Sequence, residues 1–262
     1  MDIDIKKKYR KNAFIFGYAG NKREEIDEIN KYVDKEYKTI VEPFCGSSAF
    51  SIFYHYEHKS PDTKYILNDN NNLLIEVYKL LLPENKDKLK STIETLNGYL
   101  VDLNKEKYNK IKKNLTVDSY IFIHKVYAIR PGLFPTTRKP VADFNYIYDT
   151  LIYKFIQENH NNITISCDNA TNIIEKYRND ETALLFIDPP YILEYNKFYK
   201  DDNVNIYEYL YNNQISSFKS KVILCLNSNW IIKLLFSNHI KNNYNKLYQL
   251  SKKKTEHLII SN

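Results

Sequence analysis

The chain has 262 residues, with 38 lysines and arginines against 32 aspartates and glutamates, and a formal net charge of +6. This length suits one medium domain, or one domain with an inserted subdomain, and the moderate positive charge is compatible with a polyanionic partner without identifying one. No stretch is long and apolar enough to span a bilayer, and the first residues lack the basic and then apolar layout of a signal peptide, so we expect a soluble, intracellular protein.

The three cysteines are Cys45, Cys167 and Cys225. They are far apart, odd in number and adjacent to apolar runs, so we expect buried thiols in a reducing compartment. His55 and His58 have a spacing that metal ligands can adopt, but the sequence offers no cysteine pair or third ligand nearby. We therefore expect no metal site.

The first third of the chain alternates between strand and helix patterns. In chain order we expect an apolar and then glycine-containing segment (13–22), a helix (23–32), a strand (39–41), a tight turn (42–48), a helix (49–56), a strand (64–67) and a helix (73–82). Alternation of this kind is typical of an α/β fold with a doubly wound parallel sheet.

The middle of the chain, 83–161, has a different pattern of long, charged helical stretches and a proline-containing loop at 130–140. We interpret it as a helical insertion in the sheet domain. The sheet domain would then be formed by 1–82 and 162–262.

Strand patterns return in the last third. We expect strands at 163–167 and 183–187, a polar and aromatic loop at 192–205, a helix at 206–218, a strand at 222–226, a helix at 230–236, and two terminal runs at 246–250 and 257–260 that are joined by lysines. The carboxyl end of the chain thus continues the alternation of the amino-terminal part.

The tetrad Asp188-Pro189-Pro190-Tyr191 follows the apolar run at 183–187 and is the most informative feature of the chain. The run is typical of a buried parallel strand, and two successive prolines end it in a rigid turn. Ligand crevices of open α/β sheets lie at the carboxyl ends of their strands. There, the Asp188 carboxylate and the Pro189 carbonyl can accept both hydrogens of an exocyclic amine while Tyr191 stacks on its ring. The tetrad therefore indicates a site for a flat aromatic amine.

Polar residues also follow the other expected strands. Gly46 lies in the turn after the first strand, where a glycine lets backbone amides approach a ligand. Asp69 follows the second strand, where a carboxylate suits the two hydroxyls of a ribose, although a simple turn former explains an aspartate in an asparagine-rich loop as well. Asp168 follows the next strand. The order of these residues, with Asp188 as the last, predicts that a nucleoside binds at this edge.

These motifs resemble those of the Dam-like (D12 class) DNA N6-adenine methyltransferases, which use S-adenosylmethionine, and the resemblance covers nearly the whole chain outside 83–161. It implies a Rossmann-like methyltransferase sheet that is mostly parallel and ends in an antiparallel hairpin. Segment 18–22 is similar to the family's amino-terminal cofactor motif, and 42–47 is similar to its methionine-binding turn. The cofactor-binding residues that the resemblance implies are Tyr18, Lys22, Glu42, Phe44, Cys45, Gly46, Ser47, Asp69, Asn70, Cys167, Asp168 and Asp188.

The catalytic residues that the resemblance implies are Asp188, Pro189, Pro190 and Tyr191. The ending 255–262 is similar to the family's closing strand, which leads us to expect a complete chain. Two positions depart from the family pattern: Ser48 stands where many members have a second glycine, and Tyr18 occupies a position that is often tryptophan. Either departure would weaken cofactor affinity without abolishing it.

The DNA-reading segment of the family lies in the position of 83–161, so the resemblance implies that this insertion recognises target DNA. The loop at 130–134 loosely resembles the family's arginine-glycine-aromatic loop. The residues that we expect to contact DNA are Arg130, Arg138, Lys139, Tyr195, Lys252, Lys253 and Lys254. For the three consecutive lysines, a solvated hairpin turn is an equally good explanation. We expect the loop at 192–205 to close over the flipped base.

The reaction that these features imply is direct methyl transfer from S-adenosylmethionine to a flipped-out adenine of double-stranded DNA. A proline-cysteine nucleophile motif, which cytosine C5 methylation needs, is absent from the sequence. Two alternatives stay open: an adenine-N6 methyltransferase that acts on RNA, and a catalytically degenerate DNA-binding or cofactor-binding subunit. A cognate restriction endonuclease is a further partner that an enzyme of this kind can have, whereas the recognition sequence and the oligomeric state cannot be read from the sequence.

Overall fold

The computed structural model describes residues 1, 3–18, 20–58, 60–126, 142–191, 206–247 and 254–262. The chain forms two compact units. The first unit comprises Met1–Arg23, Gly46–Pro61 and Asn71–Ile165, and the second comprises Glu24–Cys45, Asp62–Asn70 and Ser166–Asn262. Within the described residues, no helix has the length and apolar character needed to cross a membrane.

The first unit is built mainly from helices. They are α1 (Ile3–Asn12), α3 (Ala49–His58), α4 (Asn72–Leu80), α5 (Lys86–Leu100), α6 (Lys105–Lys113), α7 (Val117–Val126) and α8 (Leu151–Asn159), with short 3-10 turns η1 (Pro83–Asn85) and η2 (Asn145–Asp149). Polar side chains begin several of them: the side chain of Asn71 accepts a hydrogen bond from the Leu74 amide at the start of α4, and Thr150 does the same for the Tyr153 amide at the start of α8. Within the described parts of 83–161, α5, α6, α7 and α8 agree with the helical pattern of the sequence.

Helix α1 was not predicted, because its sequence is strongly charged and carries little apolar periodicity. Tyr9 is the buried residue of this helix, and its hydroxyl donates a hydrogen bond to the carbonyl of Ala49 at 2.9 Å. Contact with α3 therefore stabilises a helix that its own sequence favours only weakly.

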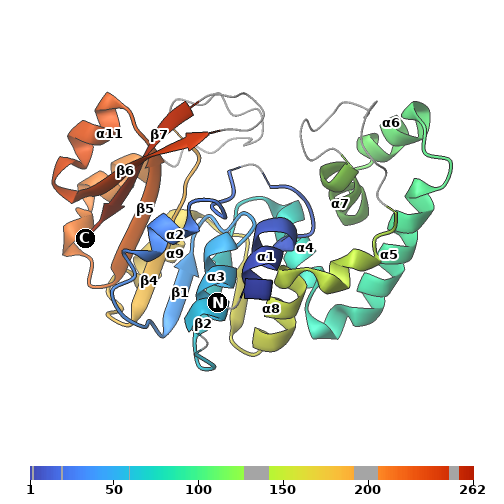
Figure 1. Cartoon of the computed structure of the whole chain (residues 1–262), viewed down its shortest axis with the longest axis horizontal. Coiled ribbons are helices and arrows are strands. Elements are labelled where there is room, and N and C mark those ends of the chain that lie inside the picture. Colours follow the sequence, from blue (N-terminus) through green and yellow to red (C-terminus); the bar gives the residue numbers. More distant parts are fainter. Residues whose placement is uncertain (2, 19, 59, 127–141, 192–205, 248–253) are drawn as a thin grey trace. The chain divides into compact units, whose positions relative to one another are not determined.

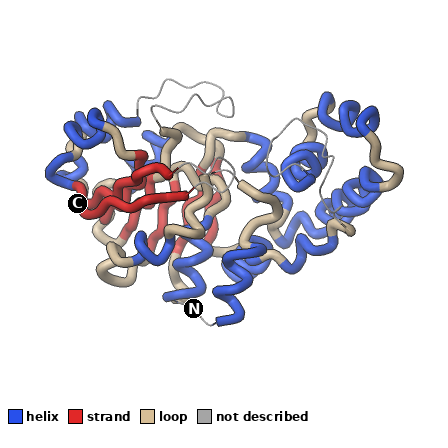
Figure 2. Tube along the Cα trace, turned by 45° about the horizontal axis from the view of Figure 1, so that its top comes forward, coloured by secondary structure: helices blue, strands red, loops and turns tan. Residues whose placement is uncertain are grey.

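In the described part of the chain, seven strands form one sheet in the order β3-β2-β1-β4-β5-β7-β6 (Figure 1). Their bounds are β1 (Thr39–Glu42), β2 (Lys64–Asn68), β3 (Ile163–Ser166), β4 (Ala183–Ile187), β5 (Lys221–Asn227), β6 (Ile240–Leu247) and β7 (Lys254–Ser261). β1, β2, β4 and β5 pair in parallel, whereas β7 pairs antiparallel with both β5 and β6. The strands lie side by side in Figure 2 as well, so the predicted α/β fold with a mostly parallel sheet and an antiparallel carboxyl-terminal pair is confirmed.

One face of the sheet packs against helices of the second unit, which are α9 (Ala170–Tyr177), α10 (Ile206–Asn212) and α11 (Trp230–Leu235). Alternate residues of β4, namely Ala183, Leu185 and Ile187, belong to this buried apolar cluster. The intervening Leu184 and Phe186 are buried as well. Burial on both faces explains why β4 is a continuous apolar run rather than an alternating one.

Several predicted boundaries differ from the structure. The helix predicted at 23–32 is the shorter α2 (Ile26–Asn30). The helix predicted at 206–218 is divided into α10 and a separate 3-10 turn, η3 (Ile215–Ser217). β6 begins well before the predicted run 246–250, and its residues are largely polar. Pairing with β7, rather than the intrinsic strand propensity of these residues, therefore makes β6 a strand. A further 3-10 turn, η4 (Ser237–His239), leads into β6.

The prediction that all three cysteines are buried is wrong for Cys167, which is exposed, whereas Cys45 and Cys225 are buried. Cys225 lies within β5, but Cys167 follows the last residue of β3. The residues of β3 are only partly buried, so the apolar run beside Cys167 does not extend the core to the thiol.

Glu256 on β7 connects the carboxyl-terminal strands to their neighbours. Its carboxylate accepts hydrogen bonds from the hydroxyl of Ser228, from Lys233 Nζ at 3.0 Å and from Asn243 Nδ2 at 2.8 Å. The Ser228 bond, followed by those from Lys233 and Asn243, lowers the pKa of Glu256 from 4.5 to about 2. The folded protein therefore holds this carboxylate ionised at acidic pH where the unfolded chain would protonate it.

We expect Glu256→Gln to reduce the free energy of unfolding at neutral pH and to have a shrinking effect as the pH falls from about 4.5 toward 2. The direction of the pH dependence follows because the pKa of Glu256 is lower in the folded state than in the unfolded state. Its ionised form therefore stabilises the folded protein above the unfolded-state pKa, and this contribution is lost as the pH falls through the folded-state pKa. Urea unfolding of both proteins across this range measures the difference. Glu84→Gln, at an exposed carboxylate, is the control, and a Glu256 effect that does not change with pH would contradict the assignment.

Candidate functional site

The predicted site residues of the second unit lie at one edge of the sheet. β1 pairs in parallel with β2 and with β4, and β3 is next to β2, so the carboxyl ends of these strands are neighbours. The structure places there Glu42, Phe44 and Cys45 at the end of β1, Asp69 and Asn70 after β2, Cys167 and Asp168 after β3, and Asp188, Pro189, Pro190 and Tyr191 after β4. Residues up to 149 positions apart in sequence, from Glu42 to Tyr191, thus come to the same edge.

Two carboxylates at this edge are removed from solvent. Glu42 is 2% exposed and Asp69 is 7% exposed. Because burial of a carboxylate costs free energy, its retention at a strand end points to a role in binding or in holding the loops of a site. In contrast, Asn70, Cys167 and Asp168 are exposed.

Asn68, the last residue of β2, ties three strand ends together. Its fully buried side chain donates to the carbonyls of Pro43 at 3.0 Å and Asp168 at 2.9 Å. The side-chain oxygen accepts from the Asp168 amide at 2.9 Å and from the Ser166 hydroxyl at 2.8 Å. The backbone carbonyl of Asn68 accepts from the Cys45 amide at 2.7 Å.

Asn68 is not among the predicted site residues, because in the sequence it belongs to a polar stretch that ends a strand. An amide side chain directly after the apolar residues of a buried strand was the available signal, because a buried amide needs partners for all its polar atoms. Those partners lie about 25 and 100 positions away in sequence. Pattern analysis of local segments cannot find them.

The turn after β4 is held from the side of α10 and from the side of β7. The hydroxyl of Tyr207 on α10 donates to the carbonyl of Pro190 at 2.7 Å. The ring of Tyr191 meets the ring of His257 on β7 edge to face, with centroids 5.5 Å apart. Pro189 is buried, whereas Asp188 and Tyr191 are half-buried, so the acid and the aromatic ring remain accessible on a fixed turn.

The remaining predicted cofactor residues, Tyr18, Lys22, Gly46 and Ser47, belong to the first unit. Gly46 has a φ of +48°, and a Cβ atom built on it would lie 2.8 Å from Cε1 of Tyr18. The tyrosine ring therefore occupies the space directly over the glycine backbone, and a Cβ at this position would force the ring to shift. Lys22 is 2% exposed, and its Nζ donates to the carbonyl of Gly20 at 3.1 Å.

The turn after Gly46 is supported by a buried tyrosine. The hydroxyl of Tyr78, on α4, lies 2.7 Å from the carbonyl oxygen of Gly46 and 2.9 Å from the hydroxyl of Ser48. Ser48 has a φ of +47°, so it adopts the left-handed conformation that glycine favours. The hydrogen bond to Tyr78 and complete burial explain how a serine is kept in this conformation.

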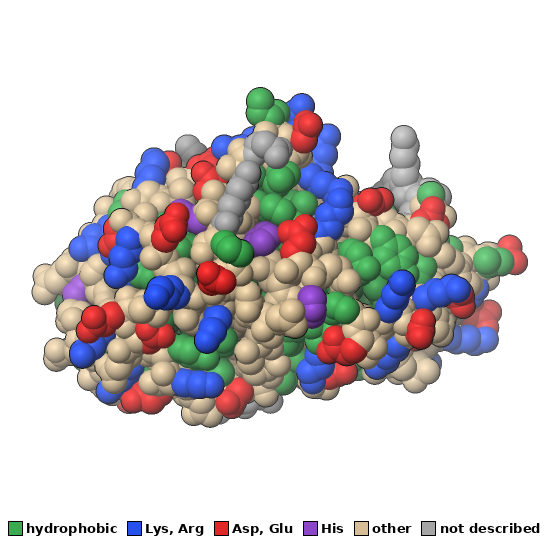
Figure 3. All heavy atoms as spheres, turned by 90° about the horizontal axis from the view of Figure 1, so that it is seen from below, with side chains coloured by type: hydrophobic (Ala, Val, Ile, Leu, Met, Phe, Trp, Pro, Cys, Tyr) green, Lys and Arg blue, Asp and Glu red, His purple; other side chains and the backbone are tan. Residues whose placement is uncertain are grey.

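Most of the predicted DNA contacts lie outside the described residues. These are Arg130, Arg138, Lys139, Tyr195, Lys252 and Lys253, together with the whole loop at 192–205 that we expect to close over the base. Lys254 is the first residue of β7. On the face seen in Figure 3, lysine and arginine side chains are interspersed with aspartates and glutamates.

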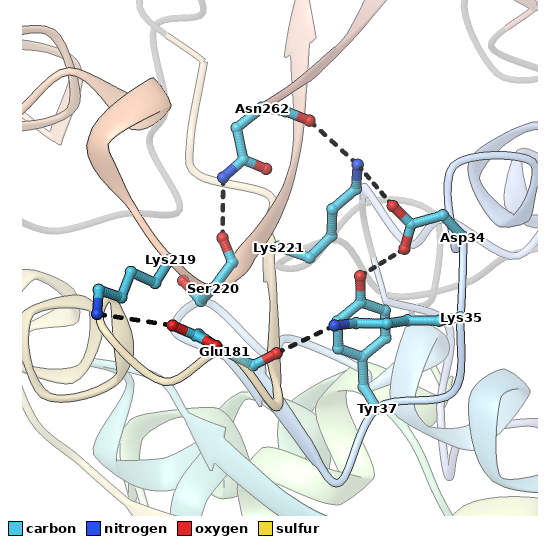
Figure 4. Close-up of a pocket in the computed structure, with 8 residues that line it drawn as sticks. All are labelled: Asp34, Lys35, Tyr37, Glu181, Lys219, Ser220, Lys221 and Asn262. Atoms are coloured by element: carbon cyan, nitrogen blue, oxygen red, sulfur yellow. Dashed lines mark hydrogen bonds and ion pairs between the residues drawn. The ribbon is translucent and has the colours of Figure 1, made fainter.

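A cavity of about 280 Å³ lies in the second unit, before the first residues of β4 and β5. Figure 4 shows its lining, which consists of Asp34, Lys35, Tyr37, Glu181, Lys219, Ser220, Lys221 and Asn262. The amino ends of the parallel strands are at the edge opposite the Asp188 turn, whereas ligands of open α/β sheets bind at the carboxyl ends. This cavity is therefore separate from the candidate site.

Two of the three lysines that line this cavity pair with its two carboxylates. Lys221 lies 3.4 Å from Asp34, and Lys219 lies 3.6 Å from Glu181. Burial raises the pKa of Asp34, but the hydrogen bond from Tyr37 and the charge of Lys221 outweigh it, so this pKa lies below its ordinary value. These contacts join the segments that precede β1, β4 and β5.

His55, considered as a metal ligand in the sequence, has protein partners. Its Nε2 lies 2.8 Å from a carboxylate oxygen of Glu158, and the side chain of Asn159 lies 3.3 Å from its Nδ1. Across the described ranges, no group of three histidine, cysteine, aspartate or glutamate side chains is placed to hold a metal ion.

A mostly parallel sheet with an antiparallel terminal pair, and with an acid, two prolines and a tyrosine after its central strand β4, defines the class of Rossmann-like methyltransferases. Residues 18–259 match the family described as D12 class N6 adenine-specific DNA methyltransferase, and the chain belongs to this family. The family resemblance inferred from the sequence motifs is thus confirmed, and the protein is a DNA methyltransferase.

A curated relative is similar over nearly its full length. The chain is 21% identical over 277 aligned positions to the Type II methyltransferase M.CviBI of Paramecium bursaria Chlorella virus NC1A, and the alignment covers 95% of this chain and 98% of the relative.

Proposed function

We propose that the protein transfers a methyl group from S-adenosylmethionine to N6 of an adenine that is flipped out of double-stranded DNA. The observation that carries the proposal is the Asp188-Pro189-Pro190-Tyr191 turn at the carboxyl end of β4 in a chain of the adenine-specific family. An accessible carboxylate, a backbone carbonyl that follows it and an aromatic ring match the edge and the face of an aminopurine.

The bond changes of the proposed step are simple. The N6 lone pair forms a bond to the methyl carbon, the carbon–sulfur bond breaks and its electron pair stays on sulfur, and one N6 proton leaves. When bound, S-adenosylmethionine supplies an electrophilic methyl group on a positively charged sulfur. The protein then has to orient N6 and stabilise the positive charge that develops on it.

Asp188 carries both tasks in this proposal. Its carboxylate accepts one N6 hydrogen and, with the Pro189 carbonyl accepting the other, draws the amine out of conjugation with the ring. As the nitrogen becomes cationic, the negative charge of Asp188 stabilises it and provides the first acceptor for the departing proton. Tyr191 stacks on the base, which excludes water and fixes its plane.

The residues proposed to hold the cofactor are those implied by the family motifs. Gly46 supports the assignment, because the absence of a Cβ lets the ring of Tyr18, a second proposed cofactor contact, lie against its backbone, and the buried carboxylate of Asp69 is suited to ribose hydroxyls. The other proposed cofactor contacts are Tyr18, Lys22, Glu42, Phe44, Cys45, Ser47, Asn70, Cys167, Asp168 and Asp188.

We propose that 83–161 contacts the target DNA. Within it, α6 supports this role, because its exposed lysines outnumber its single acidic residue, Glu106, which pairs with Lys110 at 3.0 Å. Exposed lysines can neutralise phosphates independently of sequence. The further proposed contacts are Arg130, Arg138, Lys139, Tyr195, Lys252, Lys253 and Lys254.

The test is to incubate the purified protein with labelled S-adenosylmethionine and a plasmid from a methylation-free host. We expect label in DNA as N6-methyladenine at a defined sequence, which mapping of the modified adenines would identify. Parallel reactions with RNA of the same sequence measure the second candidate. Label only in RNA would replace the DNA proposal, and binding of DNA and cofactor without transfer would identify a degenerate subunit.

The relative's designation as a Type II methyltransferase leads us to propose that the chain modifies DNA alongside a restriction endonuclease of the same specificity. If so, DNA treated with the protein should resist cleavage by an endonuclease that recognises the mapped sequence. Cleavage of fully methylated DNA would exclude a protective role at that site.

A further inference from the structure

We propose that His257 is a positioning residue, which fixes the orientation of Tyr191 through an edge-to-face contact. The inference rests on the proposed function, in which Tyr191 stacks on the adenine. His257 follows Glu256 on β7 and is not among the predicted site residues.

The contact is specific in its geometry. The two ring centroids are 5.5 Å apart, and the ring planes are inclined by 82°. His257 is 0% exposed, whereas Tyr191 is half-buried. One ring is thus fixed within the protein while the other retains a surface for a ligand. Edge-to-face packing is a favoured geometry of aromatic rings and restricts rotation of the more exposed partner.

His257 is itself held by the strands on both sides. In the sheet register it is opposite Asn227 of β5 and opposite Tyr244 of β6. The ring of Tyr244 lies 5.5 Å from the imidazole at an angle of 33°. A row of three rings, from Tyr244 through His257 to Tyr191, therefore links β6 to the turn after β4.

The type of residue at 257 supports a specific role. The next residue on the same face of β7 is Ile259, which is also fully buried. A buried imidazole is less favourable than an aliphatic side chain, because its polar nitrogens lose their water. A flat ring, however, can present a defined edge or face to Tyr191, which a branched aliphatic side chain cannot.

Loss of this contact would remove one restraint on the side-chain angle of Tyr191. The two prolines fix the backbone before Tyr191, and the Tyr207 hydrogen bond holds the Pro190 carbonyl, so the backbone of the turn would persist. The base would then have to select the productive angle when it binds. We expect methyl transfer to slow by about three- to tenfold, the size of an aromatic pair contact.

The experiment is a double-mutant cycle on the full chain, once its target sequence has been mapped. Single-turnover methylation is measured for the wild type, His257→Ala, Tyr191→Ala and the double variant. We expect His257→Ala to lower the rate in the wild-type background, with little change in DNA affinity, and to have no further effect when Tyr191 is already alanine. We also expect His257→Phe, which keeps a ring, to recover most of the rate.

Ile259→Ala is the matched control, since it removes a fully buried side chain from the same face of the same strand. Its effect should multiply with that of Tyr191→Ala. A second readout is the fluorescence of 2-aminopurine at the target position, which stacking on Tyr191 quenches. His257→Ala should change this signal in the direction of Tyr191→Ala, while Ile259→Ala should not.

Equal rate losses from His257→Ala in both backgrounds would show a merely structural role and overturn the proposal. A wild-type protein that methylates no DNA would instead overturn the proposed function, and the role of Tyr191 with it. The two failures are therefore distinguishable from the wild-type reaction alone.

Discussion

Replacement of Asp188 by alanine is expected to lower the rate of methyl transfer by at least about 10²- to 10³-fold, the range seen when a group that stabilises transition-state charge is removed. The carboxylate follows β4 at the carboxyl edge of the sheet and is half-buried, so it is available to a substrate amine. Single-turnover incorporation of labelled methyl groups into DNA measures this rate.

The structure also predicts that the loss is chemical rather than structural. Asp188 lies beyond the last residue of β4, and the turn that follows has its own support from Tyr207 and His257. The unfolding midpoint of Asp188→Ala should remain close to that of the wild type. Asp188→Asn, which keeps the shape and removes the charge, should lose most of the activity, because an amide does not stabilise a cationic nitrogen as a carboxylate does. Activity within about tenfold of wild type for both variants would rule out the proposed role.

Gly46→Ala is expected to have the second largest effect, on both stability and cofactor binding. The residue has a φ of +48°, where an alanine costs about 1–2 kcal/mol. In addition, the new methyl group would meet Cε1 of Tyr18 at 2.8 Å, so the ring must move. We expect the affinity for S-adenosylmethionine to fall by more than about tenfold, which calorimetric titration measures.

Two other glycines separate these effects. Gly20 has a φ of +80° and no described atom within 4 Å of an added Cβ, so Gly20→Ala introduces backbone strain without a clash among the described residues. Gly98 lies in α5, again with none of the described atoms within 4 Å of an added Cβ, so Gly98→Ala should be neutral or stabilising. Gly46→Ala should destabilise the protein more than Gly20→Ala. If the two variants are equal in urea unfolding, the ring of Tyr18 does not restrict residue 46.

The parts of this protein that could be predicted are those with a local physical signature. The apolar run before Pro189 and Pro190 predicts a strand that ends in a rigid turn, and β4 has the predicted bounds. The turn at Gly46 could also be predicted locally, because a glycine directly after a strand indicates a backbone conformation with positive φ.

Features that depend on distant partners were missed or misjudged. The amide network of Asn68 connects residues about 100 positions apart, and β6 is a strand because β7 pairs with it. Cys167 is exposed because the edge strand β3 is only partly buried, which its own residues do not reveal. The role of His257 beside Tyr191 also follows from sheet order, which places β7 next to β5, rather than from any local pattern.

The hydrogen bonds of Asn68 have a consequence for how the gene can vary. They join positions 43, 68 and 168, and between the last two the chain makes an excursion of 100 residues that includes 83–161. The entropy of closing a loop of this size grows only with the logarithm of its length, by about 0.6 kcal/mol for each doubling. Insertions or deletions within 83–161, which holds none of the proposed cofactor contacts, would therefore disturb the hydrogen bonds of Asn68 very little. With 83–161 as the proposed DNA contact, a new sequence preference could be acquired there while the residues of the edge stay unchanged.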